Sequence, residues 1–543
     1  MTARRSYSRR ALLGAGAAAG AGLMLGGCGT GRAQRATNVG KDLVPWPEYL
    51  PAEGPPPDLA GDADAGIQQG YLRYPTDLVT SVPERPGRGE EITVLLVTNE
   101  PPPSPPSRNR MWRAVNEALG VELKLSFVPS LYLPQRVATM MASEDMPDVI
   151  TCMDEVPRIG DFVATKCADL TPYLSGSAVR DYPNLANLPT YAWSGVGRFN
   201  GRLMGVPIER PQPSPVMLCN RDAFDGAGGL EEWTPEEFRE RMRELTADRR
   251  WASGCVTKTD VDRHAAWRGG DNLWSLDGAG AFHPVEATEA YADALGFVRD
   301  LVSDGVFYPD QITVPELKIQ LFGENVFAIS DTLPAYQTGV AAVGDSFALD
   351  MARPYATGAG AGPKLWSGPG WVNYTILKDA EPERIRLILR VLDYLAAPFG
   401  SREYEVVRFG VEGAHYTRDE DGEIVLTDLA DLENYNTLPL QYLSSPPLVA
   451  YNPGFPEATR RQWQYQVDTS EFLVANPATG LRTAAKDRYG TVTEQILVDA
   501  CNDIVNGRAP VTSWDGVLRR WRDEGGVEIA EGLQAEYEAV HGR

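Results

Sequence analysis

The chain has 543 residues, with 51 basic and 74 acidic side chains and a net charge of −23. It is 43% hydrophobic and 23% charged, which is typical of a globular protein with a large core. The acidic composition argues against binding of nucleic acid, whose phosphates need a basic face, and against adhesion to anionic lipid. The length predicts roughly two to four domain-sized units or two large lobes.

The amino terminus is predicted to be an export signal. Residues 1–10 carry four arginines and no acidic side chain, and residues 11–27 form an uncharged stretch rich in Ala, Gly and Leu. This pattern is typical of a signal peptide, because a membrane-spanning helix needs about 20 apolar residues. An uncleaved membrane anchor is the alternative. Residues 8–13 resemble the twin-arginine export consensus, although signals of the general route also carry arginine pairs.

The sequence Leu25-Gly26-Gly27-Cys28 resembles the bacterial lipobox. In signals of this kind, the cysteine becomes the diacylated amino terminus after cleavage before it. We therefore expect a signal peptide over residues 1–27 and a lipid anchor on Cys28. Residues 28–90 are rich in Pro, Gly and Asp, which predicts a tether and an irregular lead-in. Aromatic residues such as Trp46 and Tyr71 could let part of this segment wrap the body.

The remaining five cysteines show neither a CxxC motif nor a Cys/His spacing that would bind a metal. No metal site and no cofactor is predicted from them. A disulfide is permitted outside the cytoplasm, and Cys152 and Cys167 are the best-placed pair. Two buried free thiols are at least as good an interpretation.

The body begins with alternating strand and helix patterns. In chain order these are a buried strand at 91–97, a helix at 109–119, a strand at 121–128, a helix at 135–143 and a strand at 147–150. A Pro-rich loop at 101–106 separates the first two elements. This alternation predicts a parallel sheet with helices on its faces.

A second set of similar elements follows residue 215. It comprises a strand at 216–220, a helix at 235–246 opened by the capping box Thr234–Glu237, a helix at 286–304, strands at 325–330 and 374–377, and a helix at 381–397. An Asn-Gly turn at 200–201 and an Asp-Gly turn at 421–422 predict hairpins, and helices are predicted from residue 491 onward. The repetition of the pattern predicts two lobes of the same α/β class.

Several short segments resemble the family 1 extracellular solute-binding proteins of ABC importers, and in particular their oligosaccharide-binding lipoproteins. The segments are the lipobox at 25–28, Met146–Ile150, Asp169–Leu174, Gly201–Pro207, Thr234–Phe238, Asp304–Asp310, Gly410–Tyr416 and Asp503–Val511. Each segment alone is a weak signal. Their order and spacing over roughly residues 90–540 carry the resemblance.

The resemblance implies an α/β, two-lobed fold like that of periplasmic binding proteins, with a multi-segment hinge and a ligand cleft between the lobes. It implies that the chain crosses the hinge near residues 213, 370 and 470. Lobe 1 would then consist of residues 91–212 and 372–470, and lobe 2 of residues 213–371 and 471–543. The Pro-rich loop at 101–106 departs from the family pattern.

A carbohydrate offers apolar C–H faces, which aromatic rings cover, and hydroxyls, which Asp, Glu, Asn and Arg bind. Cleft residues are expected just after the carboxyl ends of strands or at the hinge. The predicted ligand-binding residues are Asn99, Asp154 and Arg210 in the first lobe, Trp274, Asp331 and Tyr336 in the second, and Trp371 at the hinge. For the carboxylates a helix cap or a surface charge is an equally good interpretation. For Trp274 and Trp371 core packing is equally good.

The resemblance implies a receptor that binds an oligosaccharide or another small molecule and delivers it to an ABC permease. We expect a monomer on the extracytoplasmic face of the cell membrane, with no catalytic residue and no nucleic-acid partner. The chain lacks the Walker A, HExxH and GxSxG motifs. A secreted glycosidase stays open as an alternative because two carboxylates suffice for that chemistry. A surface protein that keeps the fold but does not serve transport is another.

Overall fold

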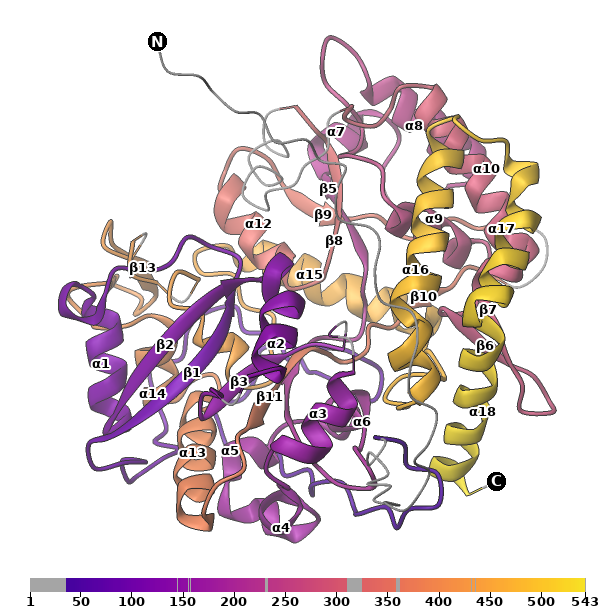
Figure 1. The fold of residues 1–543 in the computed structure, drawn as a ribbon. Coiled ribbons are helices and arrows are strands. Elements are labelled where there is room, and N and C mark those ends of the chain that lie inside the picture. Colours follow the sequence, from indigo (N-terminus) through magenta and orange to yellow (C-terminus); the bar gives the residue numbers. More distant parts are fainter. Residues whose placement is uncertain are drawn as a thin grey trace, which may run out of the picture. The chain divides into compact units, whose positions relative to one another are not determined.

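The computed structural model describes residues 36–542 except residues 144, 155, 157, 230–232, 310–324, 358–361, 431 and 435. The predicted signal peptide over 1–27 and the predicted lipidation site Cys28 lie outside the described residues. Residues 34–543 belong to one compact unit. Within it two sheets can be followed, and each is the centre of one lobe (Figure 1).

The first lobe is built on a five-stranded sheet in the order β2-β1-β3-β11-β4. Its strands are β1 (Glu90–Thr98), β2 (Val121–Pro129), β3 (Val149–Cys152), β4 (Val206–Glu209) and β11 (Trp371–Leu377). Strands β1, β2 and β3 are parallel, as the alternation of strands and helices predicts. Strand β11 is antiparallel to both β3 and β4, so the sheet is mixed rather than parallel throughout.

Alternating residues of β1 explain how both faces of this sheet are covered. Ile92, Val94 and Leu96 lie in one hydrophobic core, with helices α1 and α13. Leu95 and Val97 lie in another, with α2 and α3. The helices of this lobe are α1 (Arg110–Leu119), α2 (Leu133–Met141), α3 (Ile159–Lys166), α4 (Thr171–Leu174), α5 (Pro183–Ala186), α6 (Thr190–Val196), α13 (Pro382–Leu395) and α14 (Arg402–Arg408). A strand buried on both faces reads as a continuous apolar run, which is why the sequence identified it.

The second lobe is built on a three-stranded antiparallel sheet in the order β8-β5-β9. Its strands are β5 (Val216–Asn220), β8 (Ala328–Asp331) and β9 (Leu349–Met351). The helices around it are α7 (Arg221–Gly226), α8 (Pro235–Leu245), α9 (Lys258–Trp267), α10 (Glu289–Ser303) and α12 (Ala335–Val343). Two hairpins stand apart from the large sheets, β6 (Trp274–Leu276) with β7 (Phe282–Pro284) and β12 (Tyr416–Arg418) with β13 (Ile424–Leu426).

The chain passes between the two sheets in neighbouring connections. It leaves the first sheet after Glu209 and enters the second at Val216, and it returns between β10 (Leu365–Trp366) and β11. Strand β10 pairs with β14 (Leu473–Val474), and Pro213 pairs with Ser367. The connections near 213, 367 and 473 therefore run side by side, close to the positions that the resemblance implies for the hinge.

The carboxyl-terminal part packs on the second lobe. Helices α16 (Ala484–Val505) and α17 (Trp514–Trp521) share a core with α9 and α10, and α18 (Val527–His541) packs beside α16 (Figure 1). Helix α15 (Pro456–Thr469) contributes Ala458 and Tyr465 to the core around β5 and β9. It thus lies with the second sheet, although the sequence placed residues 372–470 in the first lobe. The reason is that its buried face fits the second core, which chain order cannot show.

Residues 36–90, for which the composition predicts a tether and an irregular lead-in, pack against the body. Asn38 is buried, and Trp46 packs against the core of the first lobe. Tyr71 and Tyr74 pack on Phe399, with ring centroids 4.5 and 5.1 Å apart from it. A few aromatic and amide side chains suffice to dock this segment even though its composition is poor in apolar residues.

Cys152 and Cys167 are buried free thiols, so the predicted disulfide between them is not present. Burial raises the pKa of the Cys152 thiol to about 12, which keeps it protonated. No helix of the described part of the chain is both long and apolar enough to cross a membrane.

Candidate functional site

Four of the predicted site residues lie at one edge of the first sheet. Asn99 follows β1, Asp154 follows β3 and Arg210 follows β4, and these three strands run in the same direction. Trp371 begins the antiparallel strand β11 and pairs with Glu209, so it lies at the same edge. Carboxyl ends of parallel strands are where α/β folds place their ligands, so this edge is the candidate site.

Tyr442 ties this edge together. The Asn99 Nδ2 donates to the Tyr442 hydroxyl at 2.9 Å, and the Arg210 guanidinium lies 5.8 Å from the centre of the Tyr442 ring. Asn373 Nδ2 donates to the Tyr442 carbonyl at 2.7 Å and so holds the short helix η5 (Leu440–Tyr442) against β11. An amide, a guanidinium and a phenol ring are thereby held within reach of one another.

Trp371 is half-buried beside this cluster. Its ring packs edge-on against Tyr374, with centroids 5.6 Å apart. Gly195 lies under the indole, since a Cβ on that glycine would come within 2.6 Å of the Trp371 Cδ1 atom. The indole nitrogen is buried and has no hydrogen-bond partner among the described residues. One edge of the ring is therefore locked in the protein, and the half-exposed remainder is what a ligand could touch.

Asp154 is already engaged by a cation from the carboxyl-terminal part of the chain. Arg482 Nη1 contacts Asp154 Oδ1 at 2.5 Å, and Arg482 Nε donates to the Val196 carbonyl at 3.1 Å. The guanidinium also lies 4.1 Å from the centre of the Phe199 ring. A ligand would have to compete with this pair for the Asp154 carboxylate, so the arrangement gives Asp154 a part in holding the segment around Arg482.

The three residues predicted in the second lobe are not brought together. Asp331 ends β8 and pairs with Val216, at the hinge end of the second sheet. Tyr336 is fully buried, and its hydroxyl lies 3.0 Å from the Leu349 carbonyl and 3.1 Å from that of Ala458. Trp274 packs on Phe282 and Trp521, with ring centroids 6.1 Å away in both cases. Asp331 is the one of the three that ends a strand beside the connection from the first lobe, because its partner Val216 begins β5.

A buried polar network stands beside Asp331. Arg263 Nη2 donates to Asp260 Oδ1 at 2.8 Å, and the Ser330 hydroxyl donates to the same oxygen at 3.0 Å. Arg263 and Asp260 are both buried. Because Ser330 directly precedes Asp331, this network fixes the end of β8 and with it the backbone that presents Asp331.

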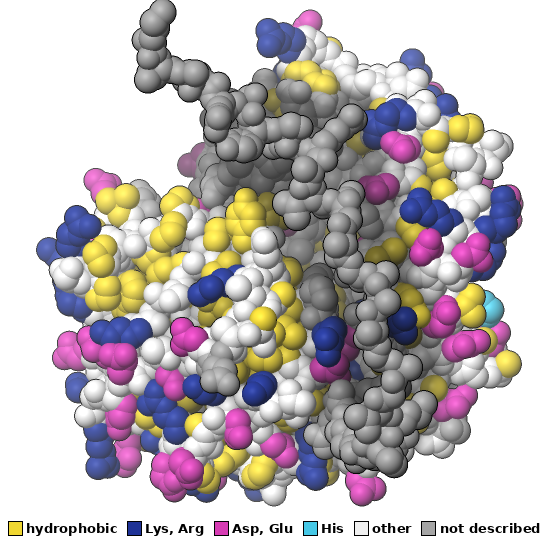
Figure 2. All heavy atoms as spheres, in the orientation of Figure 1, with side chains coloured by type: hydrophobic (Ala, Val, Ile, Leu, Met, Phe, Trp, Pro, Cys, Tyr) yellow, Lys and Arg dark blue, Asp and Glu magenta, His cyan; other side chains and the backbone are white. Residues whose placement is uncertain are grey.

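Sequence reasoning missed two groups of residues at this edge: the exposed side chains that follow β2, and Tyr442. Leu131 and Tyr132 follow β2 directly, and 79% and 56% of their surfaces are exposed. In Figure 2, hydrophobic side chains gather on the part of the first lobe where α2 and the carboxyl ends of β1 and β2 lie. The position of Tyr132 after a predicted strand was a usable signal. Tyr442 offered none, because it arrives from a long connection more than 300 residues after Asn99.

Glu209 and Arg210 are neighbours in sequence, but Glu209 lines a cavity of the described structure, whereas Arg210 lies near the Tyr442 ring. Glu209 is buried, and it accepts hydrogen bonds from the Tyr191 hydroxyl at 2.5 Å and the Leu448 amide at 3.0 Å. Burial raises the pKa of the Glu209 carboxyl. It lines a cavity of about 360 Å³ between the segment 49–71, the connection at 209–212 and residues 446–449. None of the seven predicted site residues lines this cavity.

Among the residues that the structure describes, no group of three or more His, Cys, Asp or Glu side chains is arranged to hold a metal ion. The polar side chains at the sheet edge are instead amide, guanidinium and hydroxyl groups, together with the Asp154 carboxylate, which Arg482 already engages. Amide, guanidinium and hydroxyl groups exchange hydrogen bonds with an uncharged polar ligand without any change in charge.

Comparison with known proteins gives relatives of low identity and wide coverage. No protein-family model matches the chain. It is 22% identical over 449 residues to the polygalacturonan/rhamnogalacturonan-binding protein YtcQ of Bacillus subtilis, covering 78% of this chain and 87% of that protein. It is 21% identical over 472 residues to the lipoprotein LipO of the same organism, covering 81% and 90%.

The solved structures agree in fold. An HMO-binding, ABC-transporter-associated solute-binding protein from Bifidobacterium longum infantis matches with a TM-score of 0.61 at 11% identity, covering 83% of this chain and 99% of that one. The chain therefore has the two-lobed α/β fold of extracellular solute-binding proteins, which confirms the predicted fold class. The resemblance to solute-binding proteins is confirmed as well, since YtcQ is named a binding protein and the Bifidobacterium structure a solute-binding protein, and neither is named as an enzyme.

Proposed function

We propose that this chain is an extracytoplasmic receptor that captures a carbohydrate in the form of an oligosaccharide and delivers it to an ABC-type permease. The observation that carries the proposal is the cluster at the edge of the first sheet, where Asn99, Arg210 and Tyr442 converge beside Trp371. The binding partners that the names of YtcQ and the Bifidobacterium protein state support a carbohydrate as the ligand class. The body acts as a monomer in this proposal.

The cluster has both kinds of group that a sugar ring requires. Asn99 and Arg210 offer amide and guanidinium donors for hydroxyls, and the guanidinium can bind two oxygens at once. Trp371 and the exposed Tyr132 offer ring faces for the apolar C–H side of a pyranose. A ligand held by both kinds of group is fixed in position and orientation.

Delivery requires a change that the permease can detect, and the hinge provides one. Ligand bound at the first-lobe edge favours the arrangement in which the second lobe, with Asp331 at its hinge end, also contacts it. The connections near 213, 367 and 473 lie side by side, so rotation about them moves one lobe relative to the other with few torsions changed. Ligand then shifts the population toward the closed arrangement.

Lipid anchoring through Cys28 completes the proposal. The lipobox motivates it, and LipO, a relative, is named a lipoprotein. Ala36, the first described residue, is buried, and an extended chain covers at most about 3.5 Å per residue from Cys28 to this point. The anchored body would therefore stay within about 30 Å of the lipid surface, close to a permease in the same membrane.

The test is binding without turnover. Mature protein is screened by thermal shift against a panel of oligosaccharides, and each hit is titrated by calorimetry and checked by chromatography for cleavage products. Arg210→Ala should weaken binding about ten- to hundredfold, because a ligand group loses a charged partner worth about 1.5–3 kcal/mol. Arg488→Ala, an exposed arginine on α16, is the matched control and should bind as the wild type does. Failure of every oligosaccharide to bind, or the appearance of cleavage products, would overturn the proposal.

A further inference from the structure

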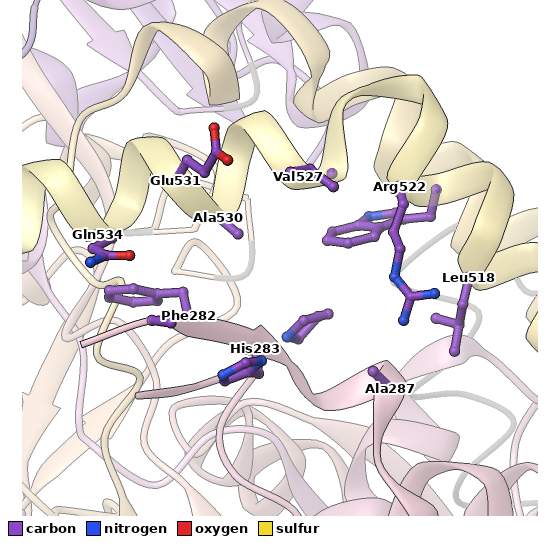
Figure 3. A pocket seen from close by; sticks show the side chains of 13 residues that line it. Phe282, His283, Ala287, Leu518, Arg522, Val527, Ala530, Glu531 and Gln534 are labelled. Carbon is purple, nitrogen blue, oxygen red and sulfur yellow. The ribbon is translucent and has the colours of Figure 1, made fainter. Parts of the chain in front are cut away.

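The second lobe carries a separate cavity of about 220 Å³, far along the chain from the hinge residues. It lies between the β6–β7 hairpin on one side and α17, the following turn and α18 on the other (Figure 3). None of the seven predicted site residues lines it. Its lining residues are Ala281, Phe282, His283, Pro284, Ala287, Leu518, Trp521, Arg522, Gly526, Val527, Ala530, Glu531 and Gln534.

A kink at two glycines borders this cavity. Residues Arg522–Gly526 connect α17 to α18, and Gly525 at φ 117° is not helical. Gly526 lies against the indole of Trp521, since a Cβ there would come within 2.4 Å of the ring. Gly525 lies against Tyr489, where a Cβ would come within 2.4 Å of that ring. The kink therefore brings α18 close to Trp521 at a point where only glycine fits.

The floor of the cavity is apolar. Phe282 and Trp521 are nearly buried, with 4% and 6% of their surfaces exposed, and Leu518 and Ala530 lie beside them. Val527 is 44% exposed and extends the apolar surface to the rim. This floor can cover the C–H face of a small ring that enters between the hairpin and the helices.

The rim of the cavity is polar. In Figure 3, Arg522 reaches from the helical side toward the hairpin, and Gln534 lies beside Phe282. The side chains of Arg522 and Glu531 make no hydrogen bond or ion pair with any other described residue. Gln534 uses its nitrogen to bond Glu538 at 3.0 Å, which leaves its oxygen as an acceptor. A cationic donor, an anionic acceptor and an amide oxygen therefore surround an apolar floor.

We propose that this cavity is a second carbohydrate subsite that takes a single uncharged sugar ring. An apolar floor under a rim of donors and acceptors matches a pyranose, which has an apolar face and a hydroxylated edge. The cavity volume is below the roughly 300–1,000 Å³ of pockets for larger ligands, so only one ring of a glycan fits inside the cavity at a time. Opposite charges at Arg522 and Glu531 favour a neutral ring over an acidic one. The subsite rests on the proposed function of the chain as a carbohydrate receptor.

Two sites on one molecule would act together on a long glycan. A chain held at the cavity by one ring has a raised local concentration at the hinge site, so the second contact becomes intramolecular. A single-ring site of this size needs only weak affinity to have this effect.

The experiment uses the mature protein carrying Trp371→Ala, so that the hinge site is weakened. Saturation-transfer NMR is recorded with the methyl glycosides of glucose, galactose, mannose, rhamnose and galacturonic acid. We expect at least one neutral glycoside to give a signal, and Ala530→Trp, which fills the cavity, to abolish it. Ala535→Trp on the exposed side of α18 is the matched control and should keep the signal.

Arg522→Ala provides an independent arm that does not depend on tolerance of a new side chain in the cavity. It should weaken binding of the glycoside about tenfold, while Arg519→Ala, an exposed arginine outside the cavity, should leave it unchanged. The absence of any glycoside signal that depends on Ala530 or Arg522 would overturn the subsite. If oligosaccharides then still bind the protein with intact Trp371, the proposed function stands alone; if they do not, it falls as well.

Discussion

Replacing Asn38 by alanine should release the amino-terminal segment from the body of the protein. Asn38 is 1% exposed and joins the carboxyl-terminal helix to the first lobe. Its Nδ2 donates to Glu536 Oε1 at 2.6 Å and to the Arg198 carbonyl at 3.1 Å. Its Oδ1 accepts from the Gly201 amide at 2.8 Å.

The magnitude follows from these contacts. A neutral hydrogen bond contributes about 1 kcal/mol and one to a charged group about 1.5–3 kcal/mol, so losing the three together should cost about 4 kcal/mol. Glu536 is fully buried, and its remaining partners are the Asn38 amide and the Thr37 hydroxyl. If the whole loss falls on local opening of the segment, the open population rises about a thousandfold. Glu536→Gln keeps one acceptor oxygen and should have a smaller effect.

Hydrogen exchange measures this opening directly. The amides of Asn38 and Val44, which bond to Glu536 and to the Gly201 carbonyl, should exchange much faster in Asn38→Ala. Asn506→Ala, an exposed asparagine at the end of α16, is the matched control and should leave both amides protected. Unchanged exchange over residues 36–44 in Asn38→Ala would refute the view that these bonds dock the segment.

Three further predictions concern stability, affinity and location. The buried Asp393 carboxyl has its pKa raised by desolvation to about 7, so the folded protein binds that proton more tightly than the unfolded chain, and the stability from this site is lost as pH rises from about 4 to 7. The free energy of unfolding of Asp393→Asn, measured in urea, should therefore rise relative to that of the wild type by up to about 4 kcal/mol between about pH 4 and 7. A difference between the two proteins that does not change with pH would contradict this. Trp371→Ala should weaken oligosaccharide binding about ten- to hundredfold in calorimetry while the protein stays folded at the assay temperature, and equal affinity would assign the ring to the core. Cys28→Ala should move the protein from the membrane fraction to the soluble fraction, and retention in the membrane would exclude lipidation as the anchor.

The secondary structure was largely predictable because its signals are local. Strand 216–220 occurs at the residues that the sequence indicates, and the capping box at Thr234 forms as its spacing predicts. Glu237 accepts from the Thr234 amide at 2.7 Å, and the Thr234 hydroxyl accepts from the Glu237 amide at 3.2 Å. Such pairs depend on residues three positions apart, so one sequence suffices to find them.

The candidate site was predictable in part. The rule that ligands bind after strand ends predicted Asn99, Asp154 and Arg210, which lie at one edge of the sheet, and Trp371, predicted at the hinge, begins β11 at the same edge. The same rule could not tell which side chains would be free. Asp154 has Arg482 as a partner, and Tyr336, in the first turn of α12, is buried with its hydroxyl bonded to two backbone carbonyls.

The sequence by itself predicted most of the elements, the class of the fold and the edge of the first sheet that forms the candidate site. Tertiary structure alone decided that β11 runs antiparallel, that residues 36–90 dock on the body and that Tyr442 meets Asn99 from 343 residues away. It also decided that a kink at Gly525 and Gly526 brings α18 beside Trp521, next to the cavity that this ring lines. The physical reason is range: periodicity and caps act over a few residues, whereas the direction of a returning strand and the partner of a buried polar group depend on segments that meet only when the cores are packed.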